Sequence, residues 1–388
     1  MPVPAKATHG QTRDYNQRLV LRTLYDLGPV SRADVARLTG LTRTTVSEVV
    51  GGLLSTGIVE EVGRGPSSGG KAPILLSVVD DARHVIGLDL GDGAFVGAVV
   101  NLRGDASRTL ELPIDGRDGA EAVALVERLV DDLVAETGGS LLGIGVGTPG
   151  VIDTRTGTIS WAVNLDWQDL PLARLLSDRY GVPTHIANDS QAAALAEYAF
   201  GGDGTRPQNL VAVKVGRGIG AGIVIDGELF QGDSFGAGEI GHTVVEDDGV
   251  ACRCGRFGCL ETVASAPAIV TRARALGYPA RDLDDVARAF EDGNEAAEAA
   301  VMAAGRSLGR VLAGVAGALD IHEIVVHGPV AALGDRWLSA VRDETIRRTL
   351  PLIADRIRIR GPHLAANEVV LGASALLMTR QLGLSLSR

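Results

Sequence analysis

The sequence predicts an α/β protein in which a small helical head, residues 1–80, precedes a larger body, residues 81–388. In the first 75 residues, apolar side chains recur at the spacing of amphipathic helices. From His84 onward, short apolar runs typical of strands alternate with helical segments. The order strand, glycine turn, strand and helix occurs twice in the body, which favours two similar α/β lobes with a cleft between them.

The charge of the chain is unevenly distributed between head and body. The net charge is −11, but up to Leu75 there are nine Lys and Arg against six Asp and Glu, which leaves 28 against 42 for the rest. Because acidic surfaces repel DNA and basic ones attract it, this asymmetry favours a DNA-reading head on a body that does not bind DNA. Residues 1–11 lack the apolar core of a signal peptide, and no apolar run is long enough to cross a bilayer. We therefore expect a cytoplasmic, nucleoid-associated protein with no membrane partner.

Three helices are expected in the head. The first covers Tyr15–Leu27, the second begins at a capping-box-like Ser31 and ends at Gly40, and the third is capped by Thr42. Two helices joined by the tight turn at residues 39–41 form a helix-turn-helix. Short polar side chains and an arginine near the start of the third helix suit contacts with base edges and phosphates in a major groove. These predicted DNA-binding residues are Arg43, Thr44, Thr45 and Ser47.

The third helix is followed by the pattern of a wing. Two short strands, at residues 58–62 and 73–78, flank the glycine-rich loop 63–71. Arg64 and Lys71 are placed to reach the DNA backbone or a narrow minor groove. The alternative is a small three-helix domain that serves dimerisation and carries a solvated glycine loop. Helix spacing, wing and polar recognition face agree with one another, which favours the DNA-binding interpretation.

The three cysteines of the chain, Cys252, Cys254 and Cys259, lie within eight positions. An odd number of cysteines is a poor disulfide framework, and a cytosolic protein would not keep one. With His242 they form the spacing H-x9-C-x-C-x4-C, which offers four nitrogen and sulfur ligands to one tetrahedral Zn²⁺. Because the protein fills all four positions, we expect one structural zinc per chain. The alternative is a set of buried thiols beside an unrelated histidine.

Several motifs of the body resemble those of the ROK family, which comprises repressors, open reading frames and sugar kinases. The strongest match is Glu239-Ile-Gly-His242 followed by the cysteine segment 252–261. Asn164-Leu-Asp-Trp167, Asn188-Asp189 and the glycine-rich segment 216–222 support it. The repressor branch of the family also carries a winged helix-turn-helix in front, including a stretch like Ser68–Pro73 at the end of the wing. The resemblance extends over essentially the whole chain.

This resemblance implies an actin-like, two-lobed sugar-kinase fold behind the winged helix-turn-helix. We expect lobe one at about residues 81–190 with a C-terminal helix at about 366–388, and lobe two at about 191–365. The family also implies a set of sugar ligands, and a polyhydroxylated ligand does need several convergent donors and acceptors. The alternatives are surface charges for the two glutamates and a helix-dipole partner for the aspartate. The implied ligands are Asn164, Asn188, Asp189, Glu239, His242 and Glu261.

The phosphate loops argue against kinase chemistry. In the family's kinases, the residue matching Asp189 is the general base that accepts a proton from the attacking hydroxyl, and here we expect a vestigial base. Asp92 stands where the kinases have a glycine, so a carboxylate would face polyphosphate. Arg217 replaces the usual threonine in the second loop, and residues 326–330 depart from the expected adenosine loop. We therefore expect no catalytic residues.

The sequence is best explained by a sugar-responsive repressor that binds a palindromic operator as a dimer or tetramer. One alternative is an ATP-dependent sugar kinase with a DNA-binding head, and another is a constitutive DNA-binding protein with a vestigial body. The sequence does not decide whether the effector is xylose, glucose, N-acetylglucosamine or a phosphorylated derivative. The alanine-rich helix expected at residues 294–319 packs within lobe two or against another subunit, and we favour internal packing.

Overall fold

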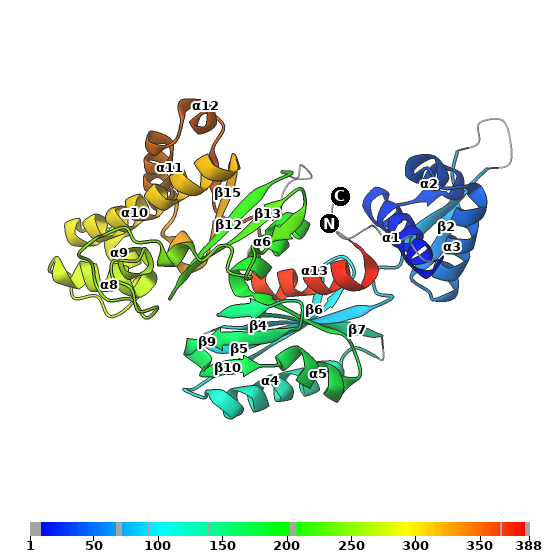
Figure 1. The fold of residues 1–388 in the computed structure, drawn as a ribbon, viewed down its shortest axis with the longest axis horizontal. Helices are drawn as coiled ribbons and strands as arrows, with labels where there is room; N and C mark the ends of the chain where they lie inside the picture. Colours follow the sequence, from blue (N-terminus) through cyan, green and yellow to red (C-terminus); the bar gives the residue numbers. More distant parts are fainter. Residues whose placement is uncertain are drawn as a thin grey trace.

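The structure is a computed structural model that describes residues 9–66, 72–91, 93–138, 140–201, 207–364 and 367–384. Figure 1 shows the head beside two lobes, with the long helix near the C-terminus lying between them. Lys71 and Asp92, to which the sequence assigns roles, lie outside the described residues.

The head consists of helices packed on a small antiparallel sheet with the strand order β1-β3-β2. Its elements are α1 (His9–Leu27), β1 (Val30–Ser31), α2 (Arg32–Thr39), α3 (Arg43–Ser55), β2 (Val59–Arg64) and β3 (Ile74–Val78). The predicted caps are confirmed, because the Ser31 hydroxyl accepts from the amide of Asp34 and the Thr42 hydroxyl from the amide of Thr45. Gly40 ends α2 with φ 70°, a left-handed conformation that glycine adopts without strain. Strand β1 was not predicted, because two residues are too few to show the alternation of a strand.

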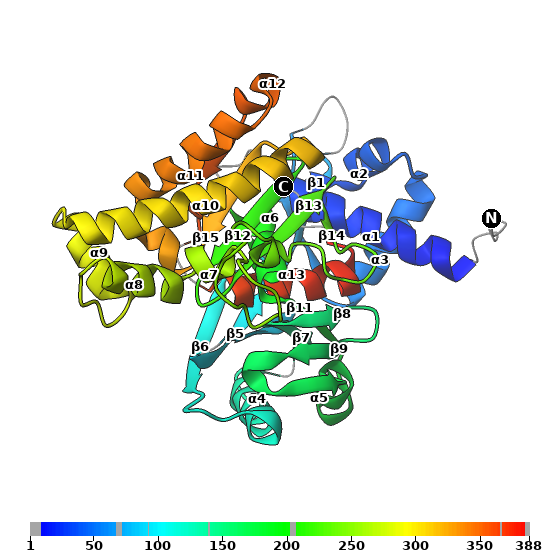
Figure 2. The same cartoon turned by 60° about the vertical axis from the view of Figure 1, so that its left-hand side comes forward.

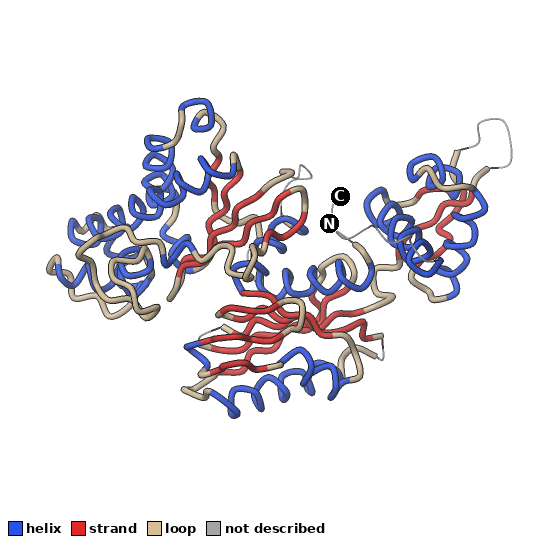
Figure 3. Tube along the Cα trace, in the orientation of Figure 1, coloured by secondary structure: helices blue, strands red, loops and turns tan. Residues whose placement is uncertain are grey.

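Lobe one is built on a mixed sheet with the strand order β11-β7-β4-β5-β6 and a smaller sheet with the order β10-β9-β8. Its strands are β4 (His84–Leu90), β5 (Ala94–Asn101), β6 (Ala106–Pro113), β7 (Leu141–Thr148), β8 (Val151–Asp153), β9 (Thr158–Ala162), β10 (Trp167–Leu170) and β11 (Thr184–Asn188). Its helices are α4 (Gly119–Val134), η1 (Val163–Leu165), α5 (Leu172–Tyr180) and α13 (Glu368–Leu382). Helices α4 and α5 cover one face of the large sheet, and α13 lies across the other (Figures 1 and 3).

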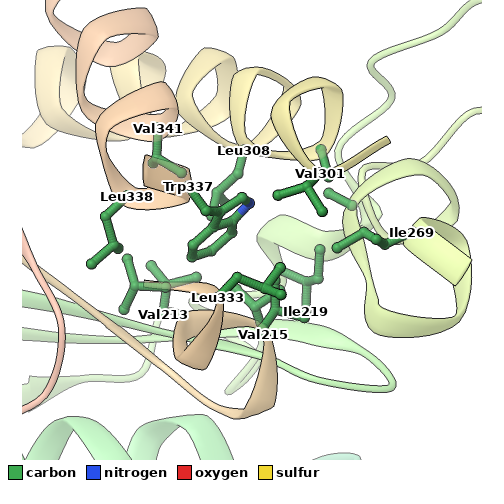
Figure 4. Close-up of a cluster of buried hydrophobic side chains, with 14 of the residues drawn as sticks. Val213, Val215, Ile219, Ile269, Val301, Leu308, Leu333, Trp337, Leu338 and Val341 are labelled. Carbon is green, nitrogen blue, oxygen red and sulfur yellow. The ribbon is translucent and has the colours of Figure 1, made fainter. Parts of the chain in front are cut away.

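Lobe two repeats this plan with the strand order β14-β13-β12-β15-β16. Its strands are β12 (Leu210–Val215), β13 (Ile219–Ile225), β14 (Glu228–Phe230), β15 (Glu323–His327) and β16 (Arg358–Arg360). Its helices are η2 (Ile240–His242), α7 (Glu261–Ala264), α8 (Ala266–Ala275), α9 (Leu283–Glu291), α10 (Glu295–Leu319), η3 (Pro329–Leu333), α11 (Asp335–Arg348) and α12 (Pro351–Ala354). Trp337 is fully buried among aliphatic side chains of the sheet and of α10 and α11, as Figure 4 shows.

Helix α10 corrects one prediction. By length and composition it is long and apolar enough to cross a membrane, although the sequence had been expected to contain no such run. Half of its apolar window is buried inside lobe two, so packing in a protein core explains its composition. Asn294 caps the helix by accepting from the amides of Ala296 and Ala297. Its buried alanines agree with the internal packing that we favoured.

Helices α13 and α6 (Asp189–Phe200) cross each other between the lobes (Figure 2). Their approach is close enough to require glycine, because a Cβ at Gly372 would lie 1.7 Å from the carbonyl oxygen of Ala192. Beneath α13, a Cβ at Gly145 would lie 2.0 Å from the carbonyl oxygen of Ala373. A tightly packed pair of helices therefore sets the position of the α6 N-terminus, where Asn188 and Asp189 lie.

The head is docked on lobe one through buried contacts. The Tyr25 hydroxyl at the end of α1 donates to the carbonyl oxygen of Leu102 over 2.7 Å. Arg103 donates to the carbonyl oxygen of Tyr25 over 2.8 Å, and its guanidinium lies 4.2 Å from the centre of the Tyr25 ring. Apolar side chains of the head share one buried cluster with Leu102, Leu377 and Met378 of the body. The orientation of the head is therefore fixed by packing.

Candidate functional site: an interlobe cleft beside a cysteine–histidine cluster

A cavity of about 350 Å³ opens between the lobes. Lobe one contributes the loop after β7, the end of β9 and η1, and lobe two contributes the β12–β13 turn, η2 and the cysteine segment. All six predicted sugar ligands line this cavity, namely Asn164, Asn188, Asp189, Glu239, His242 and Glu261. The tertiary structure thus brings together residues that are far apart in the chain.

Asp189 is held by a lysine that the sequence reasoning missed. Its Oδ2 lies 2.8 Å from Nζ of Lys214 on β12, and its Oδ1 accepts from the amide of Ser190 over 2.8 Å. Burial by itself would raise the pKa of Asp189, but Lys214 and the Ser190 hydrogen bonds hold it below its usual value. A lysine within the apolar strand LVAVKV was the signal that could have indicated a buried charge partner.

Asn188 acts first as a helix cap. Its Oδ1 accepts from the amides of Ser190 and Gln191, and its Nδ2 donates to the carbonyl oxygen of Gly150. These bonds fix the start of α6 against the loop of lobe one. Since an amide nitrogen carries two hydrogens, a donor to a ligand remains in addition to the Gly150 bond.

Arg253 links the two lobes across the mouth of the cleft. It lies between Cys252 and Cys254, and its guanidinium donates to Oδ1 of Asn164 in lobe one over 2.5 Å. The same group lies 3.5 Å from Oε1 of Glu261. The other carboxylate oxygen of Glu261 accepts from the amide of Ile219 over 3.2 Å, which ties it to the glycine-rich turn. Sequence reasoning missed Arg253, because nothing in its local pattern distinguishes it from a surface arginine.

Glu239 and His242 complete the lobe-two wall. Burial raises the pKa of Glu239, and the carboxylates of Asp189 and Glu261 add to this, while His242 opposes it. Oε2 of Glu239 lies 3.8 Å from Nε2 of His242. The other ring nitrogen, Nδ1, lies 3.6 Å from Sγ of Cys252. The imidazole therefore faces the cleft with one nitrogen and the cysteines with the other.

His242 and the three cysteines form a compact donor cluster. Their ligand atoms all lie within 4.8 Å of one another. Cys252 and Cys259 are buried, and burial raises the pKa of the Cys259 thiol to about 12. Gly258 has φ 67° in the tight turn before Cys259. Three thiols gathered around an imidazole suit a tetrahedral metal ion, whose charge would offset the cost of forming buried thiolates.

The predicted DNA-binding residues lie on an exposed part of the head. Arg43, Thr44 and Ser47 are exposed at the N-terminal end of α3, and Arg64 is exposed at the end of β2. Thr45 is half-buried and its hydroxyl is 2.9 Å from that of Thr42, so part of its hydrogen-bonding capacity serves the cap.

These features define a class of protein: a two-lobed α/β fold with a polar interlobe cleft, a cysteine–histidine cluster and an N-terminal helical region. The ROK family model matches residues 85–380, and the chain belongs to this family. It is 30% identical to the xylose repressor of Caldicellulosiruptor bescii, covering 96% of this chain and 98% of that protein. It is 33% identical to the glucokinase of Halalkalibacterium halodurans, over 77% of this chain and 96% of that protein.

The fold comparison agrees with this assignment. The crystal structure of a ROK family transcriptional regulator, a homologue of the E. coli MLC protein, superposes with a TM-score of 0.84 at 24% identity. The match covers 96% of this chain and 98% of that one, so it includes the head. The predicted actin-like, two-lobed fold with an N-terminal helical region is confirmed.

Proposed function

We propose that this chain is a sugar-responsive transcriptional repressor that binds operator DNA through its head and a small sugar in the interlobe cleft. The observation that carries the proposal is the exposed polar N-terminal end of α3 in the same chain as a cleft lined by carboxylates and amides. Similarity along nearly the full length to a protein named xylose repressor supports it. The division into a head at residues 1–80 and a body at 81–388 is part of this proposal.

In the head, α2 and α3 form the helix-turn-helix and β2 and β3 form the wing. Arg43, Thr44, Thr45 and Ser47 read the major groove, while Arg64 and Lys71 contact the backbone or the minor groove. Two heads of a symmetric dimer or tetramer bind the two halves of a palindromic operator. The opposite charge balance of head and body favours contact through the head alone.

In the cleft, carboxylate and amide oxygens accept hydrogen bonds from sugar hydroxyls, and amide and imidazole nitrogens donate to sugar oxygens. His242, Cys252, Cys254 and Cys259 would hold one structural Zn²⁺, and their loop carries Arg253 and leads directly into Glu261. When bound, the ion supplies positive charge and tetrahedral geometry that hold this wall of the cleft in place. Ligand binding moves the lobes relative to each other and changes the DNA affinity of the paired heads.

The body acts as a sensor without phosphoryl transfer. A general base needs a carboxylate that can accept a proton from a sugar hydroxyl, but Asp189 is bonded to Lys214 and its pKa is lowered. A weaker base removes a proton less readily, so Asp189 serves as a hydrogen-bond acceptor and a vestigial base. Kinase activity is the second candidate function, because the chain is also similar to a protein named glucokinase.

Fluorescence anisotropy on DNA from the gene's own upstream region tests this function. The protein is titrated onto the DNA with and without xylose, glucose, N-acetylglucosamine and their 6-phosphates, at fixed salt. We expect one of these to shift the DNA-binding midpoint. Failure to bind DNA at moderate salt would refute the repressor assignment. ADP formation from ATP with any of these sugars would support the kinase instead.

A further inference from the structure

The rim of the cleft in lobe one is apolar, unlike its floor. Trp161 at the end of β9 and Val163 in η1 line the cavity with 52% and 51% of their surface exposed. The other two tryptophans, Trp167 and Trp337, are 3% and 0% exposed. A large apolar side chain that remains exposed beside a cavity is informative about binding, because folding alone would favour its burial.

The backbone of Trp161 is held in a sheet. β9 is the central strand of the sheet with the order β10-β9-β8, and Trp161 pairs with Val151 on one side and Gln168 on the other. Its neighbour Ala162 is buried in the core of lobe one, whereas the Trp161 side chain remains exposed to solvent. Because the backbone that carries the indole is ordered before binding, a ligand that packs on it has no backbone to order there.

The three carboxylates of the cleft do not come from this rim, which contributes the amide of Asn164. Asp189, Glu239 and Glu261 come from α6 and lobe two, and they supply the acceptors for one polyhydroxylated ring. An indole offers hydroxyl groups one N–H donor and no acceptor, but its π-face attracts the C–H groups on the flat face of a pyranose. The cleft therefore has a hydrogen-bonding part and an adjoining stacking part.

The cavity is also open on its lobe-two side. A second groove of about 450 Å³ adjoins it, and the two share Arg217, Arg253 and Glu261 in their walls. A ligand that fills the polar part is therefore not enclosed at the Arg253 side. Two exposed side chains are far too small an apolar surface for a protein partner, which needs roughly 800 Å² per side. A small extension of the same ligand fits this surface best.

We propose that the cleft binds a glycoside of at least two sugar units, with the inner unit among the carboxylates and amides and the next unit stacked on Trp161. The proposal rests on the sugar-sensing function and names the class of its effector. It makes Trp161 the residue that distinguishes a disaccharide from the corresponding monosaccharide.

Calorimetry on the full chain tests this subsite with matched pairs of probes: xylose and xylobiose, glucose and cellobiose or maltose, and N-acetylglucosamine and its β-1,4 dimer. In one series we expect the disaccharide to bind about tenfold more tightly, a difference of about 1.4 kcal/mol. It should also change the tryptophan emission, because Trp161 is the exposed indole among the three. Trp161→Ala should remove this advantage and leave monosaccharide affinity within about twofold, and Trp161→Phe should keep part of it.

Phe257→Ala is the matched control, because Phe257 is 60% exposed near the cysteine cluster but does not line the cleft cavity. It should leave both affinities unchanged. If disaccharides have no advantage over a monosaccharide that binds, the subsite is refuted while the sugar-sensing function stands. Equal losses for both probes in Trp161→Ala would also refute it, because the indole would then cover the inner sugar. If no probe binds, both proposals fail.

Discussion

The contact between Arg103 and Tyr25 is expected to transmit ligand binding from the body to the head. Arg103→Ala removes the 2.8 Å hydrogen bond to the Tyr25 carbonyl, the guanidinium over the Tyr25 ring and a 2.8 Å ion pair with Asp80. The hydrogen bond from a charged donor contributes about 1.5 kcal/mol and the cation–π contact about 0.5–1 kcal/mol. The ion pair adds little, because Asp80 is half exposed.

The sum is about 2–2.5 kcal/mol, so the population of undocked heads should rise about 30- to 60-fold. Hydrogen exchange measures this directly, since amides at the head–body contact exchange at a rate set by local opening. We expect faster exchange around Tyr25 and Leu102, with the core of lobe two unchanged. In anisotropy assays, DNA affinity without sugar should persist while its response to sugar weakens.

Arg108→Ala is the control for Arg103→Ala. It removes the same charge from an exposed position of β6, five residues after Arg103 in the chain. Tyr25→Phe provides an intermediate step, because it removes only the 2.7 Å hydrogen bond to Leu102, about 1 kcal/mol. The contradicting result is that the Arg103→Ala and Arg108→Ala proteins show the same hydrogen-exchange rates around Tyr25, with a full response of DNA affinity to sugar in both. That result would refute coupling of ligand binding to the head through this contact.

Three further predictions concern the cluster, the cleft and the recognition helix. Cys254→Ser should lower the zinc content below one per chain by elemental analysis and reduce the thermal midpoint, whereas unchanged content would exclude this cysteine as a ligand. Lys214→Met should destabilise the protein by about 3 kcal/mol at pH 7, because the Asp189 side chain, only 17% exposed, loses its charged partner. The difference in the free energy of unfolding between wild type and variant, measured with urea, should decrease in acid. In the wild type, Asp189 has a lowered pKa and loses its stabilising contribution as pH falls, whereas Asp189 of the variant protonates readily. A stability difference between wild type and variant that increases in acid would contradict the pairing of Lys214 with Asp189. Arg43→Ala should weaken operator binding and reduce its salt dependence more than Arg13→Ala, which removes a charge from α1; equal effects would argue against major-groove docking.

Local sequence patterns predicted the elements whose cause is local. Ser31 and Thr42 were recognised as caps because a helix N-terminus needs an acceptor at that position, whatever surrounds it. The spacing of His242 and the three cysteines predicted their cluster, because short loops confine the four donors. The two-residue strand β1 and the exposed edge strand β6 were missed, since neither carries a buried apolar period.

The candidate sugar ligands were predicted through family motifs, and their shared cavity is a property of the fold. Lys214 and Arg253 show what such motifs leave out. Lys214 meets Asp189 because β12 and α6 pack together, and Arg253 meets Asn164 because the lobes close on each other. Neither contact has a sequence signature, since its energy depends on distances between segments that are remote in the chain.

The sequence by itself determined the order of head and body, the helix caps and the spacing of the metal-donor residues. Each of these follows from residue types at fixed local spacing. Only the tertiary structure decided the pairing of Asp189 with Lys214, the exposure of Trp161 at the rim and the docking of Tyr25 on Leu102. Burial and charge pairing depend on which surfaces meet, and that is settled when helices and sheets pack around a common core.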